Sequence, residues 1–227
     1  MIIPPQQPDW RTYLALCKKP EKSLSRFLSD SAVTGMTLKG KVLDIGGVPN
    51  SPKDWKSFFT GYETWETLNI VSFFAPDYVA DCNAELPFSD ATFDSVVSMS
   101  TLEHIFDIRY AISEMIRILK PGGILCISVP FMFAFHGDPD DFHRPTMSWY
   151  EKTLDALNIP EHKQKIFPYC WDAFSTGISL VDNAWPVWRR RLLRPMYLLP
   201  GLLFANKQKT IDRRLYTPLG YIVAATK

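Results

Sequence analysis

Short apolar runs alternate with amphipathic stretches through the middle of the chain. The runs have the length and composition of buried strands, and several of them end at glycine or at an acid. From Asp107 to Leu119 apolar residues recur at helical spacing, and the Lys-Pro-Gly-Gly sequence at 120–123 ends that helix. The expected strands cover residues 41–45, 67–70, 78–81, 93–99 and 124–129. This alternation predicts an α/β fold, with a mostly parallel sheet and helices on both of its faces.

The two ends of the chain are less regular than its middle. Residues 1–40 carry an irregular helical stripe that is broken at Pro20, and they are interpreted as a helical preamble. Residues 41–227 form the main domain, which includes a basic insertion rich in tryptophan and leucine at about 175–214. The other elements expected in this part are a helix at 147–157 and strands at 163–169 and 219–225.

Polar residues and glycines follow the ends of the expected strands. They are Asp44–Gly47, Asn69, Asp81 and Met99–Glu103. Because ligands of open α/β sheets bind at the carboxyl ends of the strands, we expect these residues to face one site. Ser51, with Pro52 next to it, is typical of a helix start, and the free N–H groups of such a start attract an anion.

The segment from Val42 to Val129 resembles the class I S-adenosylmethionine-dependent methyltransferases, in particular the methyltransferase type 11 group. The resemblance rests on five sequences in the family's order: Val42–Gly47 (VLDIGG), Asp81–Phe88 (DCNAELPF), Phe93–Ser98 (FDSVVS), Leu102–Ile105 (LEHI) and Leu119–Gly123 (LKPGG). It implies a Rossmann-like fold whose mostly parallel sheet has seven strands, the last of them antiparallel. It also implies that S-adenosyl-L-methionine is the cofactor.

By this resemblance, the cofactor contacts are Asp44, Gly46, Gly47, Asn69, Asp81, Cys82 and Met99. Asp44 would place the amino end of the cofactor, and Asp81 would accept a hydrogen bond from the adenine amino group. Glycine at 46 and 47 lets the backbone approach a ligand closely. A structural interpretation stays open, in which Asp44 caps a turn and Asp81 is an ordinary acid at a strand end.

The sequence departs from the family pattern at two points. Val48, Pro49 and Asn50 follow the glycine pair, where the family commonly has further glycines. Asn69 stands where the family usually has an acid that holds the ribose hydroxyls, and asparagine supplies no charge there. A non-catalytic variant with a degraded cofactor loop is therefore the alternative to an enzyme.

The acceptor side is predicted in the polar segment after the strand at 124–129. His136 and His143 are candidate bases, with Asp140 or Asp141 as the partner that orients the imidazole. Arg144 could bind an acidic group of the acceptor through two hydrogen bonds. The alternative is a tight turn with capping acids, and His104 fits either a site or a structural role equally well. The segment also resembles a methyltransferase subgroup found in bacterial glycan and cell-surface biosynthesis.

A metal site is not expected in this segment. His136, Asp138, Asp140, Asp141 and His143 are close in sequence, but they lack the helical HExxH type of spacing. The interpretation preferred here is that no metal is bound.

Charge and composition restrict the partners. The formal net charge of the 227-residue chain is +1, so nucleic acid is an improbable partner. The start of the chain has no apolar stretch of the signal-peptide type, and the cysteines form no CxxC pair, which favours a cytoplasmic protein. Residues 184–206 combine arginine, tryptophan and leucine, which suits peripheral contact with the inner face of a membrane. A second interpretation is an insertion that covers the substrate.

Taken together, these patterns predict an enzyme that moves a methyl group to an acceptor oxygen. The acceptor is expected to be a hydroxyl of a sugar, of a lipid-linked molecule or of another small molecule. The alternative function is a non-catalytic, membrane-associated binding or scaffold protein built on the same fold. A nicotinamide oxidoreductase is disfavoured by the sequence at 119–123.

Overall fold

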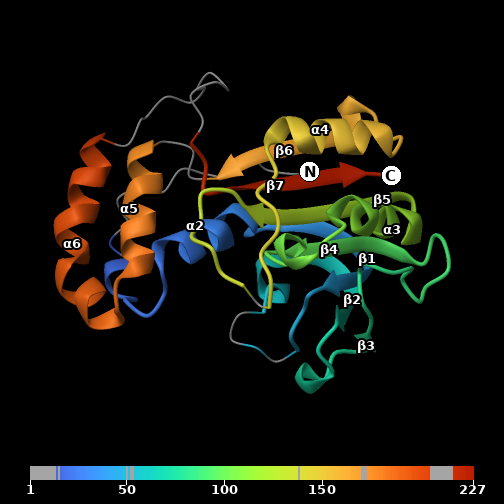
Figure 1. Ribbon diagram of the computed structural model, residues 1–227, viewed down its shortest axis with the longest axis horizontal. Helices are drawn as coiled ribbons and strands as arrows, with labels where there is room; N and C mark the ends of the chain where they lie inside the picture. Colours follow the sequence, from blue (N-terminus) through green and yellow to red (C-terminus); the bar gives the residue numbers. More distant parts are fainter. Residues whose placement is uncertain are drawn as a thin grey trace.

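The structure is a computed structural model in which strands and helices alternate around one sheet (Figure 1). It describes residues 14, 16–49, 51, 54–137, 139–169, 173–204 and 217–227. The helices are α2 (Leu24–Val33), α3 (Ile108–Ile118), α4 (Met147–Ala156), α5 (Ala173–Ala184) and α6 (Val187–Phe204). The strands are β1 (Met36–Ile45), β2 (Phe59–Asn69), β3 (Tyr78–Val79), β4 (Phe93–Met99), β5 (Leu119–Pro130), β6 (Gln164–Tyr169) and β7 (Gly220–Thr226).

The seven strands form one sheet in the order β3-β2-β1-β4-β5-β7-β6. The first five strands in this order are all parallel to one another. β7 is antiparallel to both β5 and β6. The predicted architecture, a mostly parallel seven-stranded sheet with an antiparallel last strand, is therefore confirmed. The strand order reverses between β1 and β4, and the carboxyl ends of these two parallel central strands lie side by side.

Alternating side chains of the central strands fill two cores, one on each face of the sheet. Leu43 and Val96 pack on the face covered by α3 and α4. Val42 and Val97, their immediate neighbours in sequence, pack on the face covered by α2. This division follows from the two-residue period of a strand. The sheet is buried on both sides, which explains why its strands appear in the sequence as continuous apolar runs.

Capping side chains start the helices at the positions that the sequence indicates. Asp107 accepts a hydrogen bond from the backbone N–H of Tyr110 and so begins α3. Thr146 accepts from Trp149 at the start of α4. Both side chains satisfy donors that the first helical turn would otherwise leave without a partner.

The connection from β1 to β2 differs from the prediction. A helix beginning at Ser51 was expected, but Asp54 is not helical and only a 3₁₀ turn, Lys56–Phe58, precedes β2. Pro52, the predicted first residue of that helix, lies outside the described residues, as do Asn50 and Lys53. Trp55 is 8% exposed and packs in the core under α2. Aromatic side chains of this connection therefore contribute the apolar packing that was expected from a helix.

The boundaries of other elements also differ from the prediction. β1 begins at Met36, inside the expected preamble, and the division of the chain at residue 40 stays a prediction. The sequence at 120–123 does end α3, but it forms the start of β5 rather than a turn. The helix and the strand are thus joined without a loop, because Ile118 and Leu119 are both completely buried and fix the position of the connection.

The expected insertion contains two helices, α5 and α6, which pack on each other beside α2. Arg194 of α6 is completely buried and forms an ion pair with Asp182 of α5 (Nη2 to Oδ2, 2.9 Å). Its guanidinium also donates to the backbone carbonyls of Leu16, Lys19 and Lys22. The hairpin is therefore anchored on the preamble. In the described part of the chain, no helix is both long enough and apolar enough to cross a membrane.

Candidate functional site

A bare stretch of backbone follows β1 at the carboxyl edge of the sheet. The φ angle of Gly46 is +88°, a conformation that residues with a side chain rarely adopt. A Cβ atom at Gly46 would also overlap the side chain of Thr101. At Gly47 a Cβ atom would lie 2.7 Å from a carboxylate oxygen of Asp44. Both glycines are thus required by the packing of this loop, and their contacts with a cofactor stay predictions.

Asp44, the last acid before these glycines, is almost fully buried, with 2% of its surface exposed. Burial raises the pKa of its carboxyl to about 7, and the negative charge of Asp54 adds to the rise. Among the described residues, no lysine or arginine forms an ion pair with Asp44. A buried carboxyl of this kind is suited to pair with a cationic group of a ligand, which agrees with the predicted contact to the amino end of a cofactor.

Asn69, at the end of β2, braces the same loop. Its side-chain amide donates to the carbonyl oxygens of Gly46 (3.2 Å) and Gly47 (3.3 Å). Its carbonyl oxygen accepts from the N–H of Val71. A carboxylate could not donate to either glycine carbonyl, so the departure from the family's acid has a structural reason here. A contact between Asn69 and ribose hydroxyls stays a prediction.

The other three predicted cofactor residues have different environments. Asp81 is exposed, and its carboxylate accepts from the backbone and side-chain N–H groups of Asn83, both at 2.9 Å. Cys82 is buried in the core under α3, and burial raises the pKa of its thiol to about 12. Met99 is 3% exposed and packs in the core under α2. Their contacts with a cofactor stay predictions.

A second group of side chains lies at the end of β4, next to the loop after β1. The 3₁₀ turn Leu102–His104 holds Glu103, whose side chain is completely buried. In the described part of the chain, neither carboxylate oxygen of Glu103 has a hydrogen-bond partner. Burial raises the pKa of this carboxyl to about 7. An unsatisfied buried carboxylate is costly to stability and marks a candidate functional group.

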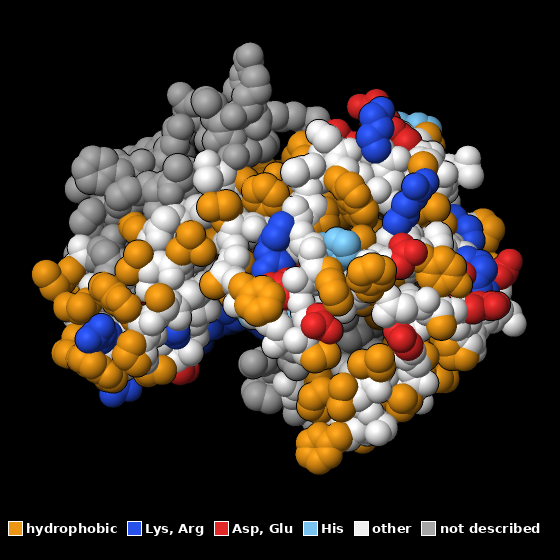
Figure 2. Space-filling view, in the orientation of Figure 1, with side chains coloured by type: hydrophobic (Ala, Val, Ile, Leu, Met, Phe, Trp, Pro, Cys, Tyr) orange, Lys and Arg blue, Asp and Glu red, His pale blue; other side chains and the backbone are white. Residues whose placement is uncertain are grey.

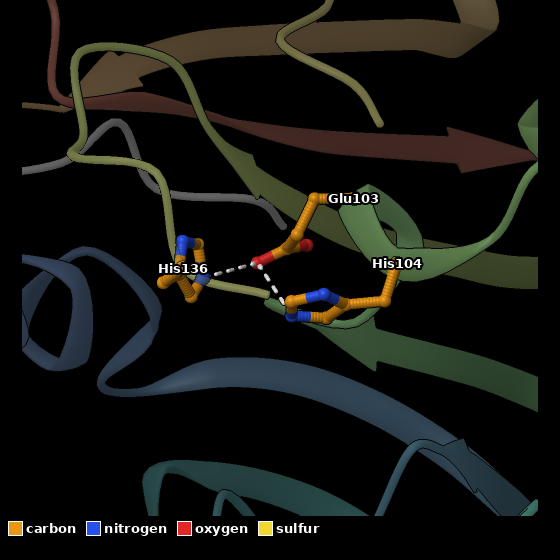
Figure 3. A group of neighbouring side chains, drawn as sticks. All are labelled: Glu103, His104 and His136. Carbon is orange, nitrogen blue, oxygen red and sulfur yellow. Dashed lines mark ion pairs between the residues drawn. The ribbon is translucent and has the colours of Figure 1, made fainter. Parts of the chain in front are cut away.

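Two imidazoles face this carboxylate (Figure 3). Nε2 of His136 lies 3.7 Å and Nε2 of His104 lies 3.9 Å from Oε1 of Glu103. The two rings are in edge-to-face contact, with 5.1 Å between their centroids. His136 comes from the polar segment after β5, so the fold brings together residues that are far apart in the sequence.

Asp141 contacts His136 on the side of its Nδ1 atom, and Arg144 in turn holds Asp141. The carboxylate of Asp141 accepts from the backbone N–H of His136 at 3.0 Å and lies 3.3 Å from its Nδ1. Arg144 donates to both oxygens of Asp141 at 2.5 Å, which lowers the pKa of that carboxyl to about 2. Arg144 therefore orients Asp141 in this structure. A contact between Arg144 and an acidic group of the acceptor stays a prediction.

The remaining predicted residues of this segment lie around the cluster rather than in it. Nε2 of His143 is 2.9 Å from the carbonyl oxygen of Phe106. Asp140 contributes its backbone carbonyl, 2.5 Å from Nδ1 of His104. Asp138 lies outside the described residues. Glu103 was not among the predicted site residues, although an acid followed by histidine directly after a central strand is a signal that could have indicated it.

Comparison with known proteins finds methyltransferases that resemble this chain in sequence and in fold. Residues 62–127 match the family model described as "Methyltransferase domain". Over 78 residues, 34% of this chain, the sequence is 35% identical to a Mycolicibacterium smegmatis protein named "Probable S-adenosylmethionine-dependent methyltransferase". The match spans 29% of that relative, so the chain covers less than a third of its length.

Solved structures show the same fold over nearly the whole chain. A methyltransferase from Archaeoglobus fulgidus is similar with a TM-score of 0.54 and 16% identity, over 96% of this chain and 100% of that one. A methyltransferase from Mesorhizobium loti is similar with a TM-score of 0.53 and 14% identity, over 89% of this chain and 98% of that one. The similarity extends well beyond the segment that the family model matches.

Proposed function

We propose that this chain transfers a methyl group from S-adenosylmethionine to an oxygen atom of an acceptor. The acceptor is a hydroxyl of a sugar, of a lipid-linked molecule or of another small molecule, as in bacterial glycan biosynthesis. One observation carries the proposal: a loop of bare backbone with a buried acid and a cluster of histidines with a buried acid lie at the ends of neighbouring strands, β1 and β4.

The residues present fit the cofactor. The glycine cradle would be filled by any side chain, and Asp44 offers a buried carboxyl to the ammonium group. Gly46, Gly47 and Asp44 would hold the methionine end, and Asp81 the adenine end. The cofactor, when bound, supplies a methyl group on a positively charged sulfur. The protein has to orient the acceptor oxygen and remove its proton.

His136 is the proton acceptor in this proposal. Its Nδ1 faces the carbonyl of Ala134 and the carboxylate of Asp141, so Nδ1 carries the hydrogen and Nε2 keeps a lone pair. Arg144 keeps Asp141 ionised, and Asp141 in turn stabilises the imidazolium that forms. His143 holds the segment in place through the carbonyl of Phe106.

The first test is calorimetric titration with S-adenosylmethionine and its demethylated product, followed by transfer assays on nucleotide sugars and lipid-linked glycans. His136→Ala is expected to lose at least about 100-fold in transfer rate while cofactor affinity stays unchanged. His162→Ala is the matched control, because His162 is exposed on the turn before β6. Full activity in both His136→Ala and His143→Ala would exclude them as bases. Absence of cofactor binding would favour the non-catalytic scaffold.

We also propose that the α5–α6 hairpin contacts an anionic membrane surface. Trp188, Leu192 and Met196 form one stripe along α6 and are 59%, 66% and 71% exposed. Arg189 and Arg191 are exposed beside this stripe. The space-filling view shows hydrophobic side chains interspersed with basic ones over this hairpin (Figure 2). An apolar stripe flanked by arginine suits the interface of a bilayer with acidic lipids.

Vesicle sedimentation tests the membrane contact. The protein is expected to bind vesicles rich in phosphatidylglycerol, and Leu192→Glu is expected to weaken binding about tenfold or more. Phe73→Glu is the matched control, since Phe73 is 90% exposed on the 3₁₀ turn Ser72–Phe74, between β2 and the edge strand β3. Equal binding by both variants would contradict the proposal and favour an insertion that covers the substrate.

A further inference from the structure

Three potential metal ligands converge at the end of β4. One atom each of Glu103, His104 and His136 can be chosen so that all lie within 4.8 Å of one another. They come from the turn after β4 and from the segment after β5, and all three side chains point to a common centre (Figure 3). We propose that these three side chains bind one divalent transition-metal ion of the Zn²⁺ type.

The hydrogen-bond partners of the two imidazoles favour a cation at this centre. Nδ1 of His104 faces the carbonyl oxygen of Asp140, and Nδ1 of His136 faces the carbonyl oxygen of Ala134. Each Nδ1 must therefore carry a hydrogen, and in the neutral imidazole each Nε2 then has a lone pair on the side of Glu103. Metal-bound histidines in proteins nearly always donate their other N–H to a carbonyl or a carboxylate in this way.

The buried carboxylate is the second and independent observation. Glu103 is completely buried, and in the described part of the chain its oxygens accept no hydrogen bond. Two imidazole lone pairs and a carboxylate oxygen thus meet with no donor between them. Such an arrangement of acceptors is unfavourable unless a proton or a metal ion lies at the centre.

The distances and the type of ligand agree with a metal ion. Ligand atoms bound to Zn²⁺ at about 2.1 Å are separated from one another by roughly 3.4 Å in tetrahedral geometry. The separations of 3.7 and 3.9 Å between the imidazoles and Glu103 need only a small contraction. Two histidines with one glutamate leave a fourth position open, which is typical of catalytic rather than structural zinc sites.

The open position has a consequence that rests on the proposed function. An acceptor hydroxyl bound there would have a much lower pKa and would lose its proton to a water molecule, without a protein base. Nε2 of His136 would then be a metal ligand, and Asp141 with Arg144 would orient that ligand. A metal ion and a proton thus compete for the same centre, and the experiment has to separate them.

The test is titration of tag-free, chelator-treated protein with Zn²⁺ against a chromogenic indicator, together with Co²⁺ absorption spectra. We expect one equivalent per chain in the wild type and a loss of at least about 100-fold in affinity for Glu103→Gln. Asp141→Asn, which keeps all three ligands, is expected to weaken binding about 10- to 100-fold. Glu161→Gln, on the exposed turn before β6, is the control and should bind like the wild type.

The outcomes separate this inference from the proposed function. No Zn²⁺ bound by folded wild type, or equal binding by Glu103→Gln, overturns the metal site and leaves a proton at the centre. Zn²⁺ binding without any affinity for S-adenosylmethionine retains the metal site and removes the proposed function. Methyl transfer that persists in excess chelator retains the proposed function and removes the catalytic role of the metal.

Discussion

Two fully buried carboxylates in this molecule have opposite surroundings. Asp182, in the α5–α6 hairpin, is paired with Arg194 through both carboxylate oxygens and also accepts from the backbone N–H of Leu24 at 2.7 Å. Glu103, at the end of β4, is just as buried, but it faces two imidazoles whose Nε2 atoms lie 3.7 and 3.9 Å from its Oε1. The first carboxylate is fully compensated, whereas the second is not.

This difference separates a structural acid from a functional one. A buried charge that is paired and hydrogen-bonded fixes how elements pack, here a helical hairpin on the preamble. A buried charge without partners lowers stability, and a fold retains it where the group acts on a ligand. The five predictions below begin with this contrast and extend it to the loop after β1, and the largest expected effect comes first.

Loss of the guanidinium at 194 should have the largest effect. Arg194→Ala removes the charge-assisted hydrogen bonds to both carboxylate oxygens of the buried Asp182 and the bonds to three backbone carbonyls, so we expect a loss of about 3–5 kcal/mol in the free energy of unfolding. Denaturant unfolding followed by circular dichroism measures it. Arg191→Ala, at an exposed position of the same helix, should stay within about 0.5 kcal/mol of the wild type. A small loss in Arg194→Ala would mean that the pair is not an anchor.

Neutralising Glu103 should have the opposite effect, with stability retained and methyl transfer lost. Glu103→Gln keeps the shape but removes the uncompensated charge, so stability should be retained or increased. Methyl transfer to the acceptor found by screening should fall at least about 100-fold. Unfolding curves and initial rates of the same preparation provide both values. Strong destabilisation with normal transfer would make Glu103 a structural acid like Asp182.

The glycine loop should show a smaller effect that is specific to the cofactor. Gly46→Ala introduces a Cβ atom at positive φ and into Thr101, and we expect at least about tenfold weaker binding of S-adenosylmethionine. Gly122→Ala is the control, since Gly122 also has a positive φ (+77°) but open space around it at the start of β5. Calorimetry should show unchanged affinity for this control. Equal losses in both variants would indicate general strain instead.

The pH dependence of cofactor binding tests Asp44. Its pKa is raised from 3.8 to about 7 by burial, so below that value the carboxyl is neutral and cannot pair with an ammonium group. Affinity should rise by up to about tenfold from pH 6 to pH 7.5. Asp44→Asn should bind weakly without this dependence. A wild-type affinity that is flat over this range would contradict the role of Asp44.

Stability depends on Asp44 in the opposite direction. A raised pKa in the folded state means that folding opposes ionisation, so the free energy of unfolding falls as pH rises from the ordinary value of 3.8 through about 7. Asp44→Asn should therefore be more stable than the wild type above pH 7 in the absence of ligand. Thermal unfolding at two pH values measures the difference.

The sequence was sufficient for the order of most strands and for the position of the glycine loop, because both depend on local patterns. Runs such as 93–99 matched their strand completely, and Asp44 with its two glycines is contiguous. The cluster around Glu103 could not be predicted in the same way, since His136 reaches it only through the fold. Arg194 lies within the segment 184–206, whose composition suits a membrane surface, and nothing in its neighbours along the chain indicates that it is buried.

The pairing of β6 with β7 sets where the chain can be altered. Tyr169, the last residue of β6, is the register partner of Gly220, the first residue of β7. These two residues lie side by side, so a short turn could join them, yet the chain inserts the whole α5–α6 hairpin there. The hairpin is thus an insertion whose two ends meet the sheet at adjacent residues, Tyr169 and Gly220. Chimeras that carry a different helical hairpin between Tyr169 and Gly220, but keep Asp182 and Arg194 and so their bonds to residues 16–24, would change the surface of the protein while retaining the pairing of β6 with β7.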